Sequence, residues 1–137
     1  MMKRVFIMLL INSLTYTCLY SQVKVIFDTD LGGDADDLGA LVMLNNFLDK
    51  GEIELLAVMS WSAEEYVVAA IDAVNRYYGH HDIPVGVRSK EGCYEEWNYC
   101  RVLAETFPHK LTNKRVPLAV DLYRQILSGQ NDNEVVI

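Results

Sequence analysis

The sequence predicts an α/β domain with a mainly parallel, Rossmann-like open sheet and flanking helices. Short apolar runs rich in β-branched residues alternate with longer segments whose apolar residues recur every three or four positions. This alternation is typical of strands followed by helices, and it favours right-handed crossovers between parallel strands. The run at 53–59 is apolar nearly throughout, as expected of a parallel strand that is covered on both faces.

The elements are expected in the order strand, helix, strand, helix, strand, helix, strand. Gly51, Gly79 and Gly129 follow the three helical segments, where glycine commonly ends a helix. Ser62 and Glu65 have the spacing of a capping box at the start of the second helix. The predicted strands cover 25–27, 53–59, 83–87 and 134–137, and the predicted helices cover 36–50, 63–78 and 117–127.

The stretch 88–116 interrupts this alternation and forms either a surface insertion or a flap over a pocket. It contains residues at helical spacing, and Pro108 stops any helix there. Pro117 fits the first position of the third helix, and Pro84 is expected at the start or on the edge of its strand. The run 134–137 starts a fourth strand that no later helix covers, so we expect the chain to be the front part of a longer protein.

Residues 1–22 have the layout of a secretory signal peptide. A basic pair precedes the apolar run 5–14, which is shorter than the roughly 20 residues that span a bilayer. Cleavage near its end would leave a domain at 23–137 that is secreted or periplasmic and not held in a membrane. The alternatives are an ordinary buried element at the start of the domain, or lipid attachment at Cys18, although the residues before Cys18 fit that pattern poorly.

The composition is that of one small globular domain. The chain has 137 residues, of which 51% are hydrophobic and 23% charged. Its formal net charge of −7 argues against nucleic acid or an anionic membrane as a partner, because both require basic patches.

Five aspartates follow the first strand within ten residues, in a strand-to-helix loop. In open α/β sheets, ligands bind in the crevice at this end of the strands. Five carboxylates so close together repel one another, and a hard divalent cation such as Ca²⁺ or Mg²⁺ removes the conflict. Alternatively, one or two of the acids simply cap the helix. The loop contains Asp28, Asp30, Asp34, Asp36 and Asp37, with Gly32 and Gly33 between them.

These residues resemble a known family. The strand followed by DTDLGGDADDLGAL is similar to the amino-terminal motif of the inosine–uridine-preferring nucleoside hydrolases, and more closely to the nucleoside-hydrolase-like branch, whose loop has two extra residues before the paired aspartates. The resemblance continues through EIELLAVMS and DIPVG, and resumes at PLAVDLYRQIL and EVVI. It implies an N-glycosyl hydrolase that splits ribonucleosides into base and ribose with a calcium-activated water.

The resemblance also implies a role for each aspartate. Asp30 would be a metal ligand and the base toward the water, and Asp37 a bidentate metal ligand. Asp36, also at the metal, would bind a ribose hydroxyl and the metal-bound water. Asp28 would orient its neighbours without touching the metal. Asp34 belongs to the two-residue insertion, so its role stays open between loop geometry and a supplementary ligand.

Two departures from the family pattern limit these expectations. The family usually has an asparagine that contacts the ribose after the second strand, whereas this chain reads MSWSAEEY. The remaining metal ligands and the acid that helps the leaving base would lie beyond Ile137. We therefore expect an incomplete metal site with little or no activity in this chain, and the full activity, with a homo-oligomer left open, in an intact parent.

Several residues are secondary candidates. Trp61 and Ser62 follow the second strand on the rim of the aspartate site and either line the pocket or serve only to cap the next helix. Tyr94, Trp97 and Tyr99 either stack on a nucleobase, which favours the flap, or pack a local helix.

Cysteines and histidines give no further site. Cys93 and Cys100, if both lie on one helix, are about 10 Å apart, too far for a disulfide. They do not have zinc spacing, and no histidine pairs with a plausible nucleophile, so none is assigned a catalytic role.

Two other functions remain open. A strand followed by Asp-x-Asp also begins haloacid-dehalogenase-type phosphohydrolases, in which Asp28 would be the nucleophile and Asp30 the acid. However, Leu31 follows where a small residue is required, and that class does not explain Asp36 and Asp37 at the start of a helix. The other alternative is a secreted protein that binds nucleosides or carbohydrates on the same scaffold without turnover.

Overall fold

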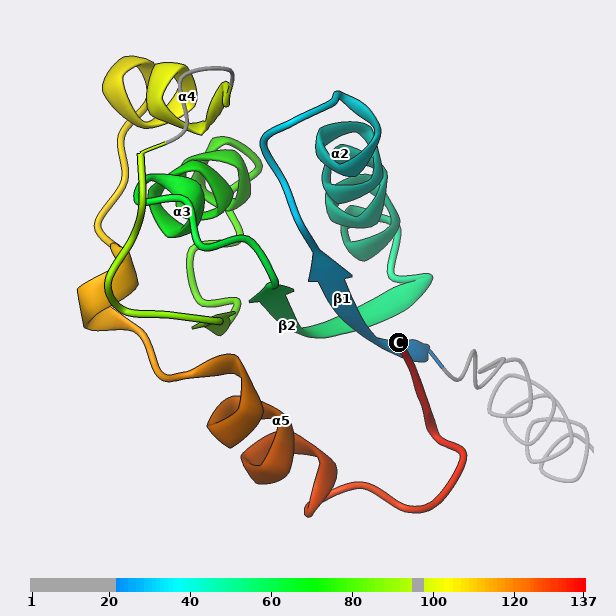
Figure 1. Ribbon diagram of the computed structural model, residues 1–137. Helices are drawn as coiled ribbons and strands as arrows, with labels where there is room; N and C mark the ends of the chain where they lie inside the picture. The colour runs from blue at the N-terminus through cyan, green and yellow to red at the C-terminus, as the bar shows by residue number, and fades with distance from the viewer. Residues whose placement is uncertain (1–21, 95–97) are drawn as a thin grey trace, which may run out of the picture.

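The computed structural model describes residues 22–94 and 98–137. Almost all of the predicted signal peptide, including Cys18, and Trp97 lie outside the described residues. The chain is an α/β protein with a four-stranded, all-parallel sheet in the order β3-β2-β1-β4 (Figure 1). The predicted fold class is therefore confirmed. The strands are β1 (Val23–Thr29), β2 (Ile53–Ser60), β3 (Val85–Val87) and β4 (Val135–Val136).

Helices cover both faces of this sheet. In order, the described helices are α2 (Asp36–Asp49), α3 (Val67–Tyr77), α4 (Cys100–Thr106), the 3₁₀ turn η1 (Asn113–Arg115) and α5 (Ala119–Leu127). Helices α2 and α3 lie on one face, and α5 lies on the other (Figure 1). None of the helices in residues 22–94 and 98–137 has the length and apolar character needed to cross a membrane.

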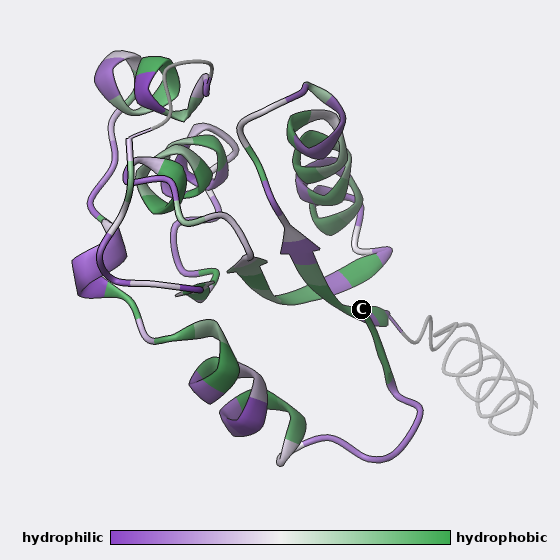
Figure 2. Ribbon diagram, in the orientation of Figure 1, coloured by the Kyte–Doolittle hydropathy of each residue, from purple (hydrophilic) through white to green (hydrophobic). Residues whose placement is uncertain are grey.

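Each face of the sheet has its own core. On the α2/α3 face, Leu41, Leu55 and Ile71 belong to one buried cluster. On the α5 face, Ile26 and Met59 pack with Leu122 in a smaller cluster. Figure 2 shows the apolar residues running along β2 and α3, as expected for elements buried between layers.

The topology places the aspartate loop at a distinctive point. β1 pairs with β2 on one side and with β4 on the other. The chain reaches β2 through α2 on one face, and it returns to β4 through α5 on the opposite face. The loop after β1 therefore lies where the crossovers change face, which is the point at which ligands bind in open α/β sheets.

The second helix begins later than predicted. α3 starts at Val67, and the expected capping box of Ser62 and Glu65 does not form. Instead, the Ser62 hydroxyl accepts the Glu64 N–H at 3.1 Å. The backbone at 63–65 pairs with Cys93, through hydrogen bonds of 3.0 Å from the Glu65 N–H and 2.8 Å to the Ala63 carbonyl. That pairing holds the segment out of the helix.

Proline positions also differ in part from the prediction. Pro117 is not in the first turn of α5, because its carbonyl accepts the Val87 N–H at 3.1 Å and Leu118 is the extended N-cap residue. Pro84 immediately precedes β3, and its carbonyl accepts the Val58 N–H at 2.9 Å. The expectation that Pro84 stands at the start of a strand is confirmed.

The described part of 88–116 packs beside α3. Helix α4 lies against α3 at the edge of the α2/α3 layer (Figure 1). The Asp72 side chain, which is 2% exposed, fixes the segment that follows. It accepts the N–H groups of Lys110 and Leu111 at 2.6 and 3.0 Å and also binds Arg76 at 2.9 Å. Burial opposes its charge, but these three donors outweigh burial and lower the pKa of Asp72.

Candidate functional site

Hydrogen bonds tie the two ends of the aspartate loop together. The Thr29 hydroxyl, at the end of β1, donates to Asp37 Oδ2 at 2.7 Å. The Asp30 N–H donates to the same oxygen at 3.0 Å, and the Leu31 N–H donates to Thr29 Oγ1 at 3.0 Å. Asp37 in the first turn of α2 is thus fixed beside Asp30. Thr29 was not among the residues singled out from the sequence, although it lies inside the DTD motif.

The loop carboxylates interact in two pairs. Burial raises the pKa of Asp37, and the neighbouring Asp30 carboxyl raises it further, whereas the Thr29 hydroxyl opposes the shift. A hydrogen bond with Asp36 raises the pKa of Asp34 and lowers the pKa of Asp36. The pKa of one member of each pair is therefore raised, chiefly by burial for Asp37 and by the neighbouring Asp36 for Asp34.

The Asp28 side chain forms a hydrogen bond with α5. Its Oδ2 accepts the hydroxyl of Tyr123 on α5 at 2.9 Å. Burial raises the pKa of Tyr123, and the Asp28 carboxylate raises it further. Asp28 therefore belongs to the α5 side of the loop, and Tyr123 is a site neighbour that the sequence pattern does not indicate.

Residues 98–100 pack against the other side of the loop. The Tyr99 N–H donates to the Gly32 carbonyl at 3.1 Å, and Cys100 Sγ donates to the Leu31 carbonyl at 3.4 Å. Gly32 has φ +139°, and a Cβ there would overlap the Asn98 side chain. This position requires glycine both for its backbone conformation and for the close approach.

An open groove lies between the loop and α5. A hollow of about 260 Å³ at the carboxyl ends of the strands is lined by residues that include Asp28, Trp61, Arg88 and Tyr123. A second hollow of about 270 Å³ adjoins it, lined by Asp28, Thr29, Asp30 and Trp61. Trp61 is therefore part of the cavity lining. Ser62 is not among the residues that line either hollow.

The aromatic residues of the 88–116 stretch do not line this groove in the part of the chain that the structure describes. Tyr94 is 56% exposed. Tyr99 lies half-buried beside the aspartate loop, and burial raises its pKa to about 12. The described part of the stretch therefore packs next to the loop and α3 rather than over the groove, and Trp97 lies outside the described residues.

The oxygen atoms that these residues offer as ligands decide whether they fit a calcium ion. Within 22–94 and 98–137, no three Asp, Glu, His or Cys side chains converge in a group that could hold a metal. Asp30 and Asp37 offer carboxylate oxygens at one place, which a hard cation prefers. The Tyr99 hydroxyl is buried and has no hydrogen-bond partner among the described residues. The Asp30–Asp37 pair therefore fits part of a cation site.

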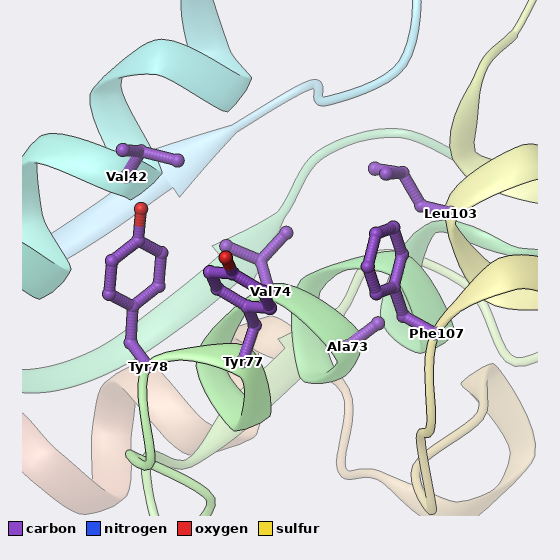
Figure 3. A pocket seen from close by; sticks show the side chains of 7 residues that line it. All are labelled: Val42, Ala73, Val74, Tyr77, Tyr78, Leu103 and Phe107. Carbon is purple, nitrogen blue, oxygen red and sulfur yellow. The ribbon is translucent and has the colours of Figure 1, made fainter.

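A separate cavity has a different character. It has a volume of about 160 Å³ and lies between α2, α3 and α4 (Figure 3). Figure 3 shows Tyr78 next to Val42 of α2, and Phe107 beside Leu103 of α4. Its lining is mainly apolar and contains no Asp, Glu, His, Cys, Lys or Arg side chain.

No protein-family model matches the chain, and no curated protein matches it at a significant level.

Proposed function

We propose that this chain carries the metal- and ribose-binding loop of an N-glycosyl hydrolase that splits ribonucleosides into base and ribose. The observation that carries the proposal is the Asp30–Asp37 pair at the carboxyl end of β1, where Thr29 and the Asp30 amide fix Asp37. The likeness of the motif to the nucleoside hydrolases supports the same reading. The activity belongs to the intact parent that the resemblance leads us to expect.

The chain's own residues suggest how the site would work. Asp37 Oδ2 already accepts two hydrogen bonds, so its Oδ1 offers the more available lone pairs for a cation held jointly with Asp30. A bound Ca²⁺ would supply charge that acidifies and orients a water. Asp30 would take up the proton from that water. Asp36, whose pKa is lowered, stays ionised and would help bind the metal while accepting a hydrogen bond from a ribose hydroxyl.

The groove beside the loop supports binding of a small organic substrate. Its walls combine the apolar side chains of Trp61 and Leu118 with the polar groups of Asp28 and Tyr123. Such a mixture of apolar surface and few polar groups is typical of small-molecule sites. A sugar next to Asp30 would place the rest of the substrate along this groove.

The test combines calcium binding with ribose release. Asp30→Asn and Asp37→Asn are expected to lower calcium affinity at least tenfold and to abolish ribose release from inosine and uridine in the parent protein. Asp121→Asn is the matched control, because Asp121 is an exposed aspartate on α5 whose carboxylate pairs with Arg124. Calorimetry and a reducing-sugar assay give the two readouts. Unchanged calcium affinity in both loop variants would show that the site is assigned to the wrong residues.

The same assays separate the two alternative functions. Release of inorganic phosphate that requires Mg²⁺ and is lost in Asp28→Asn would favour a phosphohydrolase. Tight binding of a ribosyl ligand by the parent protein, with no turnover over hours, would favour a binding protein. Calcium-dependent release of ribose would favour the hydrolase.

A further inference from the structure

The groove beside the aspartate loop has two chemically opposite ends. Asp28 and Asp30 stand at the carboxyl end of β1 and offer carboxylate oxygens, which accept hydrogen bonds. Arg88 lines the other end and offers only donors. Trp61 lies between them and lines both hollows.

The backbone holds these residues in fixed positions along the sheet edge. Trp61 follows β2, and its N–H donates to the Thr29 carbonyl of β1 at 2.7 Å. Arg88 follows β3, and its N–H donates to the Ser60 carbonyl of β2 at 2.9 Å. The backbone of each residue is therefore anchored by a hydrogen bond that extends the sheet by one residue. Because adjacent strands are about 4.8 Å apart, the two ends of the groove are separated by two strand spacings, about 10 Å.

Arg88 is held by an aromatic ring and not by an acid. Its guanidinium carbon lies 4.6 Å from the centre of the Trp61 ring, which is a cation–π contact. No Asp or Glu forms an ion pair with Arg88 among residues 22–94 and 98–137. In contrast, Arg76, Arg101 and Arg124 each pair with a carboxylate on their own helix. Arg88 is exposed, so its N–H groups are accessible to a ligand, in a chain whose net charge is −7.

We propose that the Trp61–Arg88 pair selects a ribosyl substrate that carries an acidic group, a carboxylate or a phosphate, at the end remote from the aspartate loop. A guanidinium fork matches both groups through paired hydrogen bonds. The hydroxyls of the sugar would donate to the carboxylates at one end, the flat part of the substrate would lie against Trp61, and the acidic group would meet Arg88. The orientation follows from charge, because the reverse arrangement would place the acidic group against Asp28 and Asp30.

This inference rests on the proposed function, since that function supplies the ribosyl part of the substrate. The acidic group could be on the base or on the sugar. Orotidine has a carboxylate on its base, uridine 5′-monophosphate has a phosphate on its sugar, and uridine has neither. These three compounds share the pyrimidine nucleoside and differ in where the charge lies.

The experiment measures their binding to the full chain by calorimetry in the presence of CaCl₂. At least one acidic compound is expected to bind roughly tenfold or more tightly than uridine, as a charge-assisted contact implies. Arg88→Gln should abolish that difference, whereas Arg88→Lys, which keeps the charge but not the fork, should retain part of it. Arg124→Gln, a change of the same kind on exposed α5 surface, should have no effect. Circular dichroism of each variant checks that it is folded.

The compound that gains affinity identifies the position of the charge: orotidine places it on the base, and uridine 5′-monophosphate places it on the sugar. The inference is overturned if uridine binds as tightly as both acidic compounds, if neither binds, or if the preference survives in Arg88→Gln. An Arg88-dependent preference without any ribose release in the parent protein would reject the proposed hydrolysis alone. Equal KM for all three compounds, measured by release of ribose from uridine and orotidine and of ribose 5-phosphate from uridine 5′-monophosphate, would reject the selectivity alone.

Discussion

At the scale of single residues, Thr29 connects the two ends of the aspartate loop through its hydroxyl. It is 3% exposed, and its hydroxyl accepts the Leu31 N–H while donating to Asp37. One small side chain therefore sets both the path of the loop and the position of a carboxylate eight residues later. The hydrogen bond from Thr29 explains why Asp30, in the loop, and Asp37, in α2, lie together.

Replacing Thr29 by valine tests this role. Thr29→Val keeps the shape but leaves Asp37 with one fewer donor and the Leu31 N–H without its acceptor, so we expect about 1–3 kcal/mol of destabilisation. Calcium affinity should fall as well, because only the Asp30 N–H then holds Asp37. Urea denaturation and calorimetry measure the two effects. Thr29→Ser retains the hydroxyl and should behave nearly as the unmutated chain does. Equal losses of stability and calcium affinity in the Val and Ser variants would contradict this role of the Thr29 hydroxyl.

Gly32 gives a second prediction at this scale, with an internal control. Gly32→Ala must adopt φ +139° and must displace the Asn98 side chain, so it should cost about 2–3 kcal/mol or more. Gly33→Ala should be nearly neutral, because a Cβ at Gly33 meets no atom within 4 Å and Gly33 is not among the positive-φ residues. Thermal denaturation of both variants checks the contrast. Similar melting temperatures would mean that the loop does not pack on residues 98–100.

At the scale of elements, Asp72 connects α3 to the segment that follows α4. Its buried carboxylate accepts two backbone N–H groups from 110–111 and one from the Arg76 side chain. These donors fix the start of the connection that leads through η1 to α5. Asp72, on the α2/α3 face, therefore fixes the start of the segment that crosses to α5.

The lowered pKa of Asp72 predicts a pH-dependent contribution to stability. Because the folded pKa lies below the ordinary value of 3.8, the contribution is fully present above that value and is lost as pH falls through the folded pKa. Asp72→Asn should cost about 2–3 kcal/mol at pH 7, as expected for hydrogen bonds to a charged group. The difference from the parent sequence should shrink below about pH 4. Urea denaturation between pH 3 and 7 measures it, with the exposed Asp121→Asn as control. A difference that does not change with pH would argue against the charge as its source.

At the scale of the whole molecule, charge and topology act together. The all-parallel order β3-β2-β1-β4 brings the aspartate loop, Trp61 and Arg88 to one edge of the sheet. Helix α5 lies next to Asp28, because the Tyr123 hydroxyl donates to Asp28 Oδ2. A groove with acids at one end and a guanidinium at the other is thus a consequence of three strand ends lying side by side.

The crowded carboxylates predict that calcium stabilises the whole fold. A cation that binds the native loop and not the unfolded chain adds about 2.7 kcal/mol at a concentration one hundred times its Kd, so the melting temperature should rise with added CaCl₂. The double variant Asp30→Asn, Asp37→Asn should lose this rise. In the presence of a chelator, its melting temperature should be no lower than that of the unmutated chain, because the repulsion between Asp30 and Asp37 is gone. Differential scanning calorimetry gives both values; an equal calcium effect in parent and variant would locate the binding elsewhere.

The sequence predicted the class of the fold and most of its elements, because these depend on local patterns. Helix α2 begins at Asp36 as expected, and the second strand begins at Ile53 as expected, since apolar periodicity and a following glycine are sufficient to place them. The start of α3 was placed too early. The competing pairing of 63–65 with Cys93 joins segments about 30 residues apart, and no local signal reveals it.

The sequence by itself determined that an α/β chain carries a crowd of aspartates between a buried strand and an amphipathic helix. Only the tertiary structure decided how those acids are divided: Asp30 with Asp37, Asp34 with Asp36, and Asp28 with Tyr123. It also decided that Trp61 and Arg88 meet across adjacent strand ends. The physical reason is that periodicity records which face of an element is buried, whereas a site is made by contacts between elements whose order in the sheet the local sequence does not encode.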